Sequence, residues 1–371
     1  MNRIESTARG LLETADVHVG GNRPQDIHVH NTDFYCRVLA EGSLGLGESY
    51  MDKWWNANAL DSFVEHVLRA NLQKHVRWNR HALWAVLMAK VSNRQTRERS
   101  KEVAKQHYDL SPELYESMLD PYKQYTCAYY DGTEELNAAQ EKKLDLICRK
   151  LQLRENDRVL DIGCGWGGFT RFAAERYGCN VTGISISDEQ IKYARTSCEG
   201  LPVDIQNRDY RNLKGTYDKI LTCGMLEHVG HKNHRQFFQV VHDHLSDDGL
   251  FLLQTIGGNK RGTMTDAFTD KYIFPNGELP CIAQIEEART GFLTLQDVQN
   301  LGVHYSKTLS AWHENFLASW PRIAQTYDER FRRMFEYYLL SFKGAFDAGY
   351  LQLWQLVFSK AGRVSDYRGV R

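Results

Sequence analysis

The sequence lacks the features that mark secreted and membrane-spanning proteins. Its longest uninterrupted apolar run, residues 82–89, has eight residues, whereas a helix that crosses a bilayer needs about 20. The opening residues, MNRIES, do not include the apolar core of a signal peptide. The eight cysteines are scattered and form no CxxC pair, which favours a reducing cytosol over a disulfide framework. We therefore expect a cytoplasmic protein that can bind a membrane only peripherally, without spanning it.

Net charge is also nearly absent, with 46 Lys and Arg against 47 Asp and Glu in 371 residues. A neutral chain gives no reason to expect a nucleic-acid partner. Residues 69–105 depart from this balance, because they carry ten Lys or Arg and two acids, a formal charge of +8. Apolar and aromatic residues such as Trp78 and Trp84 are interspersed, as in helices that lie on anionic lipid headgroups. Peripheral membrane binding is one interpretation, and a solvated face over a core-facing stripe is the other.

The length suits two domains. Residues 1–100 have a mostly helical pattern, and we assign them to an N-terminal lipid- or membrane-associated domain. From residue 158, short apolar runs alternate with amphipathic segments, which is typical of a parallel sheet with crossover helices. We expect residues 101–371 to form an α/β domain. Its predicted strands are residues 158–162, 180–184, 203–206, 217–223, 250–255 and 351–359, with another near Tyr305, and its predicted helices include residues 167–177, 188–198, 233–245 and 327–347.

A glycine-rich loop, GCGWGG from Gly163, follows the first predicted strand and precedes a helix. Glycines allow a tight turn and a close approach of the backbone to a nucleotide cofactor. The GxGxG spacing differs from the GxGxxG of dinucleotide sites, and the second strand ends in Ser185 where such sites favour an acid. Asp209 and Tyr210 could meet an adenine edge and ring. The candidate cofactor-binding residues here are Asp161, Gly163, Gly165, Gly167, Ser185, Gln190, Asp209 and Tyr210.

Motifs along nearly the whole chain resemble those of bacterial cyclopropane-fatty-acyl-phospholipid synthases. They are LGLGESYM from Leu44, HYDLS from His107, YTCAY from Tyr125, VLDIGCGWGG from Val159, GMLEHVG from Gly224, KYIFPNG from Lys271 and LQLWQ from Leu351. The resemblance implies a Rossmann-like class I methyltransferase domain that binds S-adenosylmethionine (SAM), with an added, mostly helical N-terminal domain. It also implies methylene transfer from SAM to the cis double bond of an unsaturated acyl chain in a membrane phospholipid, at the inner face of the membrane.

The resemblance also implies roles for single residues. Tyr125 and Thr126 are similar to a pair that caps the methionine end of SAM, and the glycine loop, Ser185 and Gln190 match ligands of its nucleoside. A bound bicarbonate ion is implied as the general base that closes the ring. The positions that match its ligands, which are our candidate catalytic residues, are Cys127, Glu227, Gln254, Ile256 through its backbone, and Tyr305.

Two positions depart from the pattern of the relatives. Gln254 stands where relatives carry histidine, which keeps a hydrogen bond but removes a titratable group. Phe342 stands where some relatives carry a cysteine, so no thiol nucleophile is required there. A cation on the acyl chain would be stabilised by aromatic faces. The candidates, which could equally pack a core, are Tyr129, Tyr272, Phe274 and Tyr305.

Several alternatives stay open. A SAM-dependent methyltransferase that makes a methyl-branched lipid or methylates a polar acceptor would need a conventional protein base. A non-catalytic lipid-surface protein that senses SAM is the alternative outside enzymes. The oligomeric state is undetermined, with a homodimer as one possibility. No metal is expected, because acidic or thiol partners are not arranged as a site around the histidines at positions 228, 231, 234, 242 and 244.

Overall fold

The computed structural model describes residues 3–72, 112–261, 263–362 and 366–371, and these form two compact units. The first unit contains residues 3–72, 264–276 and 305–351. The second contains the described residues between 112 and 263, together with residues 277–304 and the described part of 352–371. The sequence predicts one boundary near residue 100, whereas the chain passes repeatedly between the units because two later segments pack with the N-terminal helices. Most of the basic segment 69–105 lies outside the described residues.

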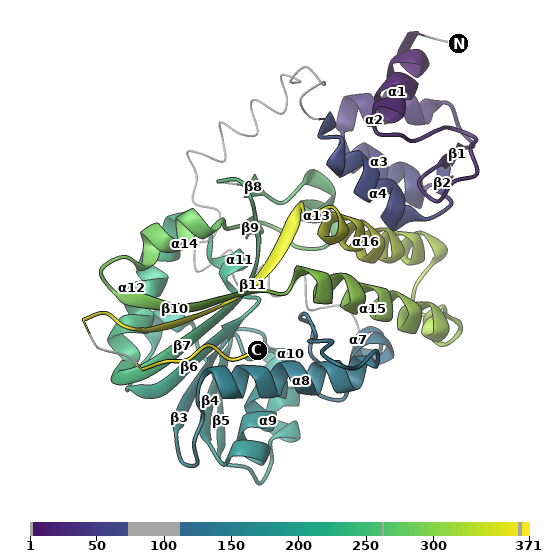
Figure 1. The fold of residues 1–371 in the computed structure, drawn as a ribbon. Helices are drawn as coiled ribbons and strands as arrows, with labels where there is room; N and C mark the ends of the chain where they lie inside the picture. The colour runs from purple at the N-terminus through teal and green to yellow at the C-terminus, as the bar shows by residue number, and fades with distance from the viewer. Residues whose placement is uncertain (1–2, 73–111, 262, 363–365) are drawn as a thin grey trace. The chain divides into compact units, whose positions relative to one another are not determined.

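The second unit is built on a seven-stranded sheet with the strand order β10-β11-β7-β6-β3-β4-β5 (Figure 1). Strands β3 to β7 run parallel to their neighbours in this group, and β10 and β11 are antiparallel to each other. The order of the parallel strands reverses between β3 and β6, where open α/β sheets bind ligands at the carboxyl ends of the strands. The strands are β3 (Arg158–Ile162), β4 (Asn180–Ser185), β5 (Val203–Asn207), β6 (Tyr217–Cys223), β7 (Leu245–Gly258), β10 (Leu293–Asn300) and β11 (Leu351–Lys360).

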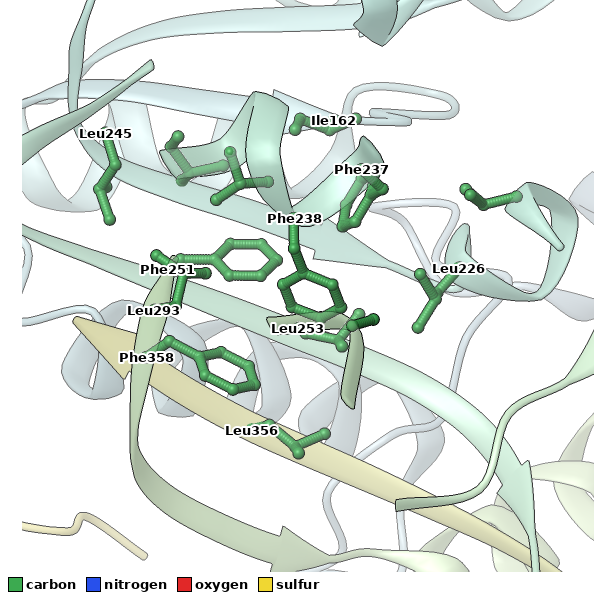
Figure 2. Packing of buried hydrophobic residues seen from close by; sticks show 14 of the residues in the cluster. Ile162, Leu226, Phe237, Phe238, Leu245, Phe251, Leu253, Leu293, Leu356 and Phe358 are labelled. Atoms are coloured by element: carbon green, nitrogen blue, oxygen red, sulfur yellow. The ribbon is translucent and has the colours of Figure 1, made fainter. Parts of the chain in front are cut away.

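Helices cover both faces of this sheet (Figure 1). The helices of this unit are α7 (Pro112–Met118), α8 (Leu136–Lys150), α9 (Gly168–Tyr177), α10 (Asp188–Ser197), α11 (Leu226–Val229), α12 (His234–His244) and α14 (Ile282–Arg289), with short 3-10 turns η2 (Tyr210–Asn212) and η3 (His231–Asn233). Successive strand residues point to opposite faces. Leu160 therefore packs with the α12 side, as Figure 2 shows for its neighbours Ile162 and Phe251, whereas Val159 packs with α8 and α9. Burial on both faces explains the nearly continuous apolar strand sequences.

Most of the predicted elements of this unit are confirmed within a residue or two, and the longest deviation is β7, which extends beyond 250–255 on both sides. The predicted strand near Tyr305 is wrong. Tyr305 lies in helix α15 (Gly302–Ile323), and the strand that precedes it is β10. The physical reason is a helical stripe of buried residues at Tyr305, Leu309, Trp312 and Phe316, whose spacing of three and four residues is that of a helix rather than a strand.

The first unit is mostly helical, as expected for the N-terminal region. It contains α1 (Arg3–Thr14), α2 (Asp33–Glu41), α3 (Ser43–Met51), α4 (Leu60–Arg69), α13 (Ala267–Tyr272), most of α15, α16 (Glu329–Asp347) and the antiparallel pair β1 (Ile27–Val29) and β2 (Trp55–Ala57). The short strands β8 (Thr263–Met264) and β9 (Glu278–Leu279) flank α13 in the sequence. Trp55 is fully buried and contacts the rings of Phe34, Tyr50 and Phe63.

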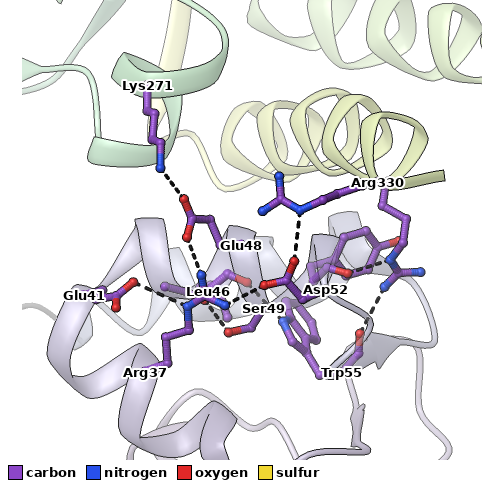
Figure 3. Close-up of polar contacts among 12 residues, drawn as sticks. Arg37, Glu41, Leu46, Glu48, Ser49, Asp52, Trp55, Lys271 and Arg330 are labelled. Carbon is purple, nitrogen blue, oxygen red and sulfur yellow. Dashed lines mark hydrogen bonds and ion pairs between the residues drawn. The ribbon is translucent and has the colours of Figure 1, made fainter. Parts of the chain in front are cut away.

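A network of ion pairs joins four helices of the first unit (Figure 3). Glu48 on α3 accepts hydrogen bonds from Arg37 on α2 and, at 2.6 Å, from Lys271 on α13. Asp52 accepts from Arg37 at 2.7 Å and from Arg330 on α16 at 3.0 Å. The sequence motifs that begin at Leu44 and Lys271 therefore meet in one polar cluster, in which Glu48 is buried and Lys271 is exposed. Because each carboxylate has cationic partners, the cost of burying its charge is offset.

Candidate functional site

The glycine loop turns sharply between β3 and α9. Gly163, Gly165 and Gly167 all have left-handed backbone angles, with φ of 81°, 55° and 81°, which glycine adopts without steric cost. A β-carbon at Gly167 would lie 2.9 Å from Ala194 Cβ on α10, so this glycine allows two helices to approach. Apart from its chain neighbours, no atom of the described residues would lie within 4 Å of a β-carbon at Gly165. The loop therefore leaves space beside bare backbone at Gly165, as a cofactor cradle requires.

Asp161 lies inside the protein beneath this loop. It is buried, and its Oδ2 accepts a hydrogen bond from Thr170 Oγ1 at 2.9 Å. Burial raises the pKa of Asp161 to about 7, and the nearby Lys143 and the Thr170 hydrogen bond limit that rise. Asp161 therefore supports the loop from within the fold.

Ser185 and Gln190 lie together at the end of β4. Ser185 Oγ donates to Gln190 Oε1 at 3.2 Å, and Ser187 caps α10 by accepting from the Gln190 backbone nitrogen at 3.5 Å. Gln190 is buried and Ser185 is half-buried. The two residues form one polar pair at the position predicted for nucleoside ligands.

Asp209 and Tyr210 follow β5. The Asp209 carboxylate caps the η2 turn through the Arg211 backbone nitrogen at 2.9 Å and forms an ion pair with the Arg211 side chain at 2.6 Å. The Tyr210 ring packs edge-on against Phe237. Asp209 thus has local structural partners that the sequence did not reveal, and its contact with an adenine ring stays a prediction.

Tyr125 and Thr126 lie between α7 and α8. The Tyr125 ring packs edge-on against Tyr115, and Thr126 Oγ1 accepts from Lys143 Nζ at 3.0 Å. A β-carbon at Gly224, just after β6, would lie 3.3 Å from Thr126 Cγ2. Thr126 is therefore placed at the carboxyl end of β6, beside the switch point of the sheet.

Glu227 is buried on α11, directly after β6. Its Oε1 accepts a hydrogen bond from the Ile256 backbone nitrogen on β7 at 2.6 Å. Its Oε2 is buried and has no hydrogen-bond partner within the described part of the chain. Burial raises the pKa of Glu227 to about 7. Glu227 and Ile256, two of the predicted ligands, are thus in direct contact, and one carboxyl oxygen of Glu227 is not engaged by the described residues.

Gln254 and Cys127 are also buried in this unit. Gln254 pairs with Cys223 in the register of β6 and β7, and its Oε1 accepts from Gln355 Nε2 on β11 at 2.9 Å. Its amide nitrogen is the end of the side chain left to donate. Cys127 Sγ lies 3.1 Å from the Ala128 carbonyl oxygen and 3.7 Å from that of Leu301. The Cys127 thiol therefore already has acceptors within the protein.

Tyr305 belongs to the first unit, where its ring packs against Trp312 and Phe346. Its convergence with Glu227 stays a prediction. Of the candidate aromatic residues, Tyr272 and Phe274 also belong to the first unit. Tyr272 donates to Glu48 at 2.8 Å, and Phe274 packs against Tyr338 and Phe342. Tyr129 lies in the second unit against His304.

Sequence reasoning missed several buried polar residues of the second unit, among them Gln140, Lys143 and Gln355. The signal for the first two was present. Leu136, Gln140, Lys143 and Ile147 follow one another at spacings of three and four residues, so polar side chains occupy the stripe of α8 that should face the core. Gln355 lies in an apolar run of β11, and its partner on β7 could not be read from one sequence.

Among the residues that the structure describes, no three or more His, Cys, Asp or Glu side chains form a cluster that could hold a metal ion. His231 Nδ1 lies 2.7 Å from Glu278 Oε2, and His244 Nδ1 lies 2.6 Å from the Gly215 carbonyl oxygen. Burial lowers the pKa values of His228 and His234 to about 4. Among the same described residues, no helix is long and apolar enough to cross a membrane.

The sheet order and the glycine loop after β3 define a class I SAM-dependent methyltransferase. The chain belongs to the mycolic acid cyclopropane synthetase family, whose model matches residues 95–356. It is 48% identical to the cyclopropane-fatty-acyl-phospholipid synthase of Escherichia coli (strain K12), over 95% of this chain and 92% of that protein. A probable fatty acid methyltransferase of Pseudomonas putida is 38% identical over 70% of this chain and 69% of its own length.

A solved structure agrees with this assignment. The mycolic acid cyclopropane synthase CmaA1, complexed with SAH and CTAB, superposes with a TM-score of 0.65 and 31% identity over 70% of this chain and 97% of its own. The present protein is thus an enzyme of the SAM-dependent one-carbon transferases. The open space at Gly165 and the polar pair Ser185 and Gln190 fit SAM as its cofactor.

Proposed function

We propose that this enzyme transfers a methylene group from SAM to the cis double bond of an unsaturated acyl chain in a membrane phospholipid and so forms a cyclopropane ring. A bound bicarbonate ion is the general base in this proposal. The enzyme acts from the cytoplasm at the inner face of the membrane, with the basic segment 69–105 as the attachment. The support is the 48% identity with a relative named for this reaction and the unusual environment of Glu227.

The observation that carries the proposal is the buried, half-satisfied carboxyl group of Glu227. One oxygen is fixed by the Ile256 backbone nitrogen, and the other has no hydrogen-bond partner within the described residues. A buried polar atom without a partner is rare, and a bound ion or water is one of the groups that explain it. Because burial raises the pKa of Glu227 to about 7, a proton resides on this side chain for much of the time at neutral pH. The protonated form has a donor to offer an anion.

The proposed roles of the chain's residues follow from this chemistry. Tyr125, Thr126, the glycine loop, Ser185 and Gln190 would hold SAM, and Glu227, Gln254, Cys127, Tyr305 and the backbone of Ile256 would hold bicarbonate. When bound, SAM supplies an electrophilic methyl group and bicarbonate supplies a base. Glu227 and Gln254 both have donors to present to an anion, whereas an ionised Glu227 would repel it. The buried side chains around them keep water away from a cation on the acyl chain.

The test compares two substitutions of Glu227 in degassed buffer, with bicarbonate then added back. Glu227→Gln keeps an acceptor for the Ile256 nitrogen and a neutral donor, whereas Glu227→Ala keeps neither. A misplaced base costs about 10²–10⁴ in rate, so we expect Glu227→Ala to be nearly inactive. Glu227→Gln should retain at least about tenfold more activity and respond to bicarbonate. Gln254→Ala should raise the bicarbonate requirement by about tenfold at most, since it loses one neutral hydrogen bond.

Full activity of the wild type without bicarbonate would contradict this role of the anion. So would equally inactive Gln and Ala variants, because they would identify the Glu227 carboxylate itself as the base. The alternative product, a methyl-branched lipid, is raised by the 38% identity with a probable fatty acid methyltransferase. Methylation of a polar acceptor is the other alternative. Mass spectrometry of the lipid product separates them from cyclopropanation.

A further inference from the structure

Two side chains of α8 hold the segment that precedes Cys127. Lys143 Nζ donates to Gln124 Oε1 and, at 3.0 Å, to Thr126 Oγ1. Gln140 Nε2 donates to the backbone oxygens of Gln124 and Thr126, at 3.3 and 2.9 Å. Residues 124–126, which we call the cap segment, are thus fixed through both their side chains and their main chain.

Both holding side chains are fully buried, with 0% exposure. Lysine is almost never fully buried unless it is paired, because removing its charge from water is costly. Gln140 Oε1 has no hydrogen-bond partner within the described residues, so the burial of this amide is only partly compensated. Burial of either side chain costs free energy that an apolar residue would avoid in a helix that only packs against a sheet. Their shared feature is that both contact the cap segment.

The surroundings of Lys143 point to the same segment. Asp120, Asp161, Cys127 and Cys223 lie close enough to Lys143 to act on its charge, and burial lowers its pKa. Asp120 accepts from the backbone nitrogens of Tyr122 and Gln124, each at 2.8 Å. The chain is therefore fixed immediately before the cap segment as well, and the acid that fixes it is an electrostatic partner of Lys143.

We propose that Lys143 and Gln140 are positioning residues for the cofactor: they order the cap segment before SAM binds. The proposal rests on the proposed function, which assigns Tyr125 and Thr126 to the methionine end of SAM. Because Lys143 donates to Thr126 Oγ1, the Thr126 hydroxyl proton must point in another direction, which fixes its orientation. An ordered cap reduces the conformational entropy lost on binding, so the affinity for SAM depends on both side chains.

The main test measures the Kd of SAM by calorimetry on the full-length protein, together with its melting temperature. Lys143→Met keeps the length of the side chain but removes its donors, and we expect the Kd to rise about tenfold, equivalent to about 1.4 kcal/mol. Lys150→Met is the matched control. Lys150 is an equally buried lysine two turns further along α8, and it donates to Gln299 on the edge strand β10 at 2.6 Å. This control should lower the melting temperature but leave the Kd within about twofold.

A second variant covers the case in which Lys143→Met does not fold. Gln140→Leu has a similar volume and removes the unpartnered oxygen together with the donors to Gln124 O and Thr126 O, so the melting temperature should fall only slightly while the Kd rises about 3–10-fold. Lys143→Met should also be less than additive with Thr126→Val, because both remove the same hydrogen bond. Wild-type affinity in Gln140→Leu and Lys143→Met, or strict additivity with Thr126→Val, would overturn the proposal. A wild-type protein that does not bind SAM would instead contradict the proposed function.

Discussion

At the scale of single residues, Glu227 links function to stability. Burial raises its pKa to about 7 from an ordinary value of 4.5, so the folded protein binds this proton more tightly than the unfolded chain. The stabilisation is complete below pH 4.5 and is lost as the pH rises through about 7. Glu227→Gln carries no charge at any pH. Relative to the wild type, it should therefore gain about 3 kcal/mol in free energy of unfolding at about pH 8.

The measurement is denaturant unfolding of wild type and Glu227→Gln across this pH range. The two curves should converge at acidic pH and separate with rising pH, with the variant more stable. A constant difference at every pH would show that the carboxyl group keeps an ordinary pKa in the folded protein. In that case Glu227 would be ionised at neutral pH and could not offer a proton to an anion.

Gly165 tests the position of the cofactor cradle. Gly165→Val places a side chain in the space that we assign to SAM, where the described part of the chain, neighbours aside, has no atom within 4 Å of the β-carbon, and it should abolish SAM binding. Gly200→Val is the matched control, because Gly200 also has a positive φ, 82°, and open space around its β-carbon. Both variants carry backbone strain of about 1–3 kcal/mol. Calorimetry should find SAM binding in the control alone, and near-normal binding by a folded Gly165→Val protein would contradict the assigned site.

The sequence predicted the glycine loop of the cofactor site better than it predicted the polar side chains around the site. The glycine loop was predictable because a strand, a turn and a helix each leave a local pattern, and only glycine suits the turn. Lys143 and Gln355 were not recognised because each acts through a partner distant in the sequence, Thr126 for Lys143 and Gln254 for Gln355. The pairing of Asp209 with Arg211 is local, but an acid after a strand in this fold suggests a ligand, so its structural partner was overlooked.

At the scale of elements, the parallel strands were predictable because alternate residues face two different cores. The strand predicted near Tyr305 was wrong because its apolar residues follow the spacing of a helix. The segment after β10 contains Tyr305, Leu309 and Trp312, and its aromatic content resembles that of a strand while its spacing is helical. β10 itself was not predicted, because it is an edge strand and carries polar residues such as Gln296 and Asp297. Most of its residues are only half-buried.

The basic segment 69–105 carries a prediction at this scale. Reversal of Arg77, Arg80, Arg94 and Arg97 to Glu should weaken binding to anionic vesicles, at about 1 kcal/mol for each charge near the surface. The affinity for SAM should not change. Flotation with vesicles of anionic and of neutral lipid measures the effect, and raised salt should reproduce it in the wild type. Unchanged flotation with anionic vesicles would mean that the segment is a solvated or intramolecular surface.

At the scale of the whole molecule, the first unit combines segments that are far apart in the sequence. Gly344 on α16 lies against α4, and a β-carbon there would overlap the Asp61 carbonyl oxygen. Gly344→Ala should therefore destabilise the protein by about 1–3 kcal/mol through overpacking. Gly10→Ala is the matched control, because Gly10 also lies in a helix but has open space around it. This change should stabilise the protein by about 0.5–1 kcal/mol.

Thermal unfolding of both glycine variants distinguishes an interleaved unit from an N-terminal domain that ends near residue 100. A melting temperature that falls for Gly344→Ala and not for Gly10→Ala supports the interleaved unit. Equal effects would mean that α16 does not pack closely on α4. The sequence alone could not predict this arrangement, because the motifs at Leu44 and Lys271 show no local sign that they meet through Glu48.

The most direct test of the proposed function is the identity of the lipid product. The enzyme is incubated with SAM deuterated in its methyl group and with vesicles of an unsaturated phospholipid, and the acyl chains are analysed by mass spectrometry and NMR. We predict a cyclopropane whose added ring carbon is CD2, because the base removes one deuteron before the ring closes, and whose yield depends on bicarbonate. A branched CD3 group on the acyl chain, or label on a polar acceptor, would contradict it.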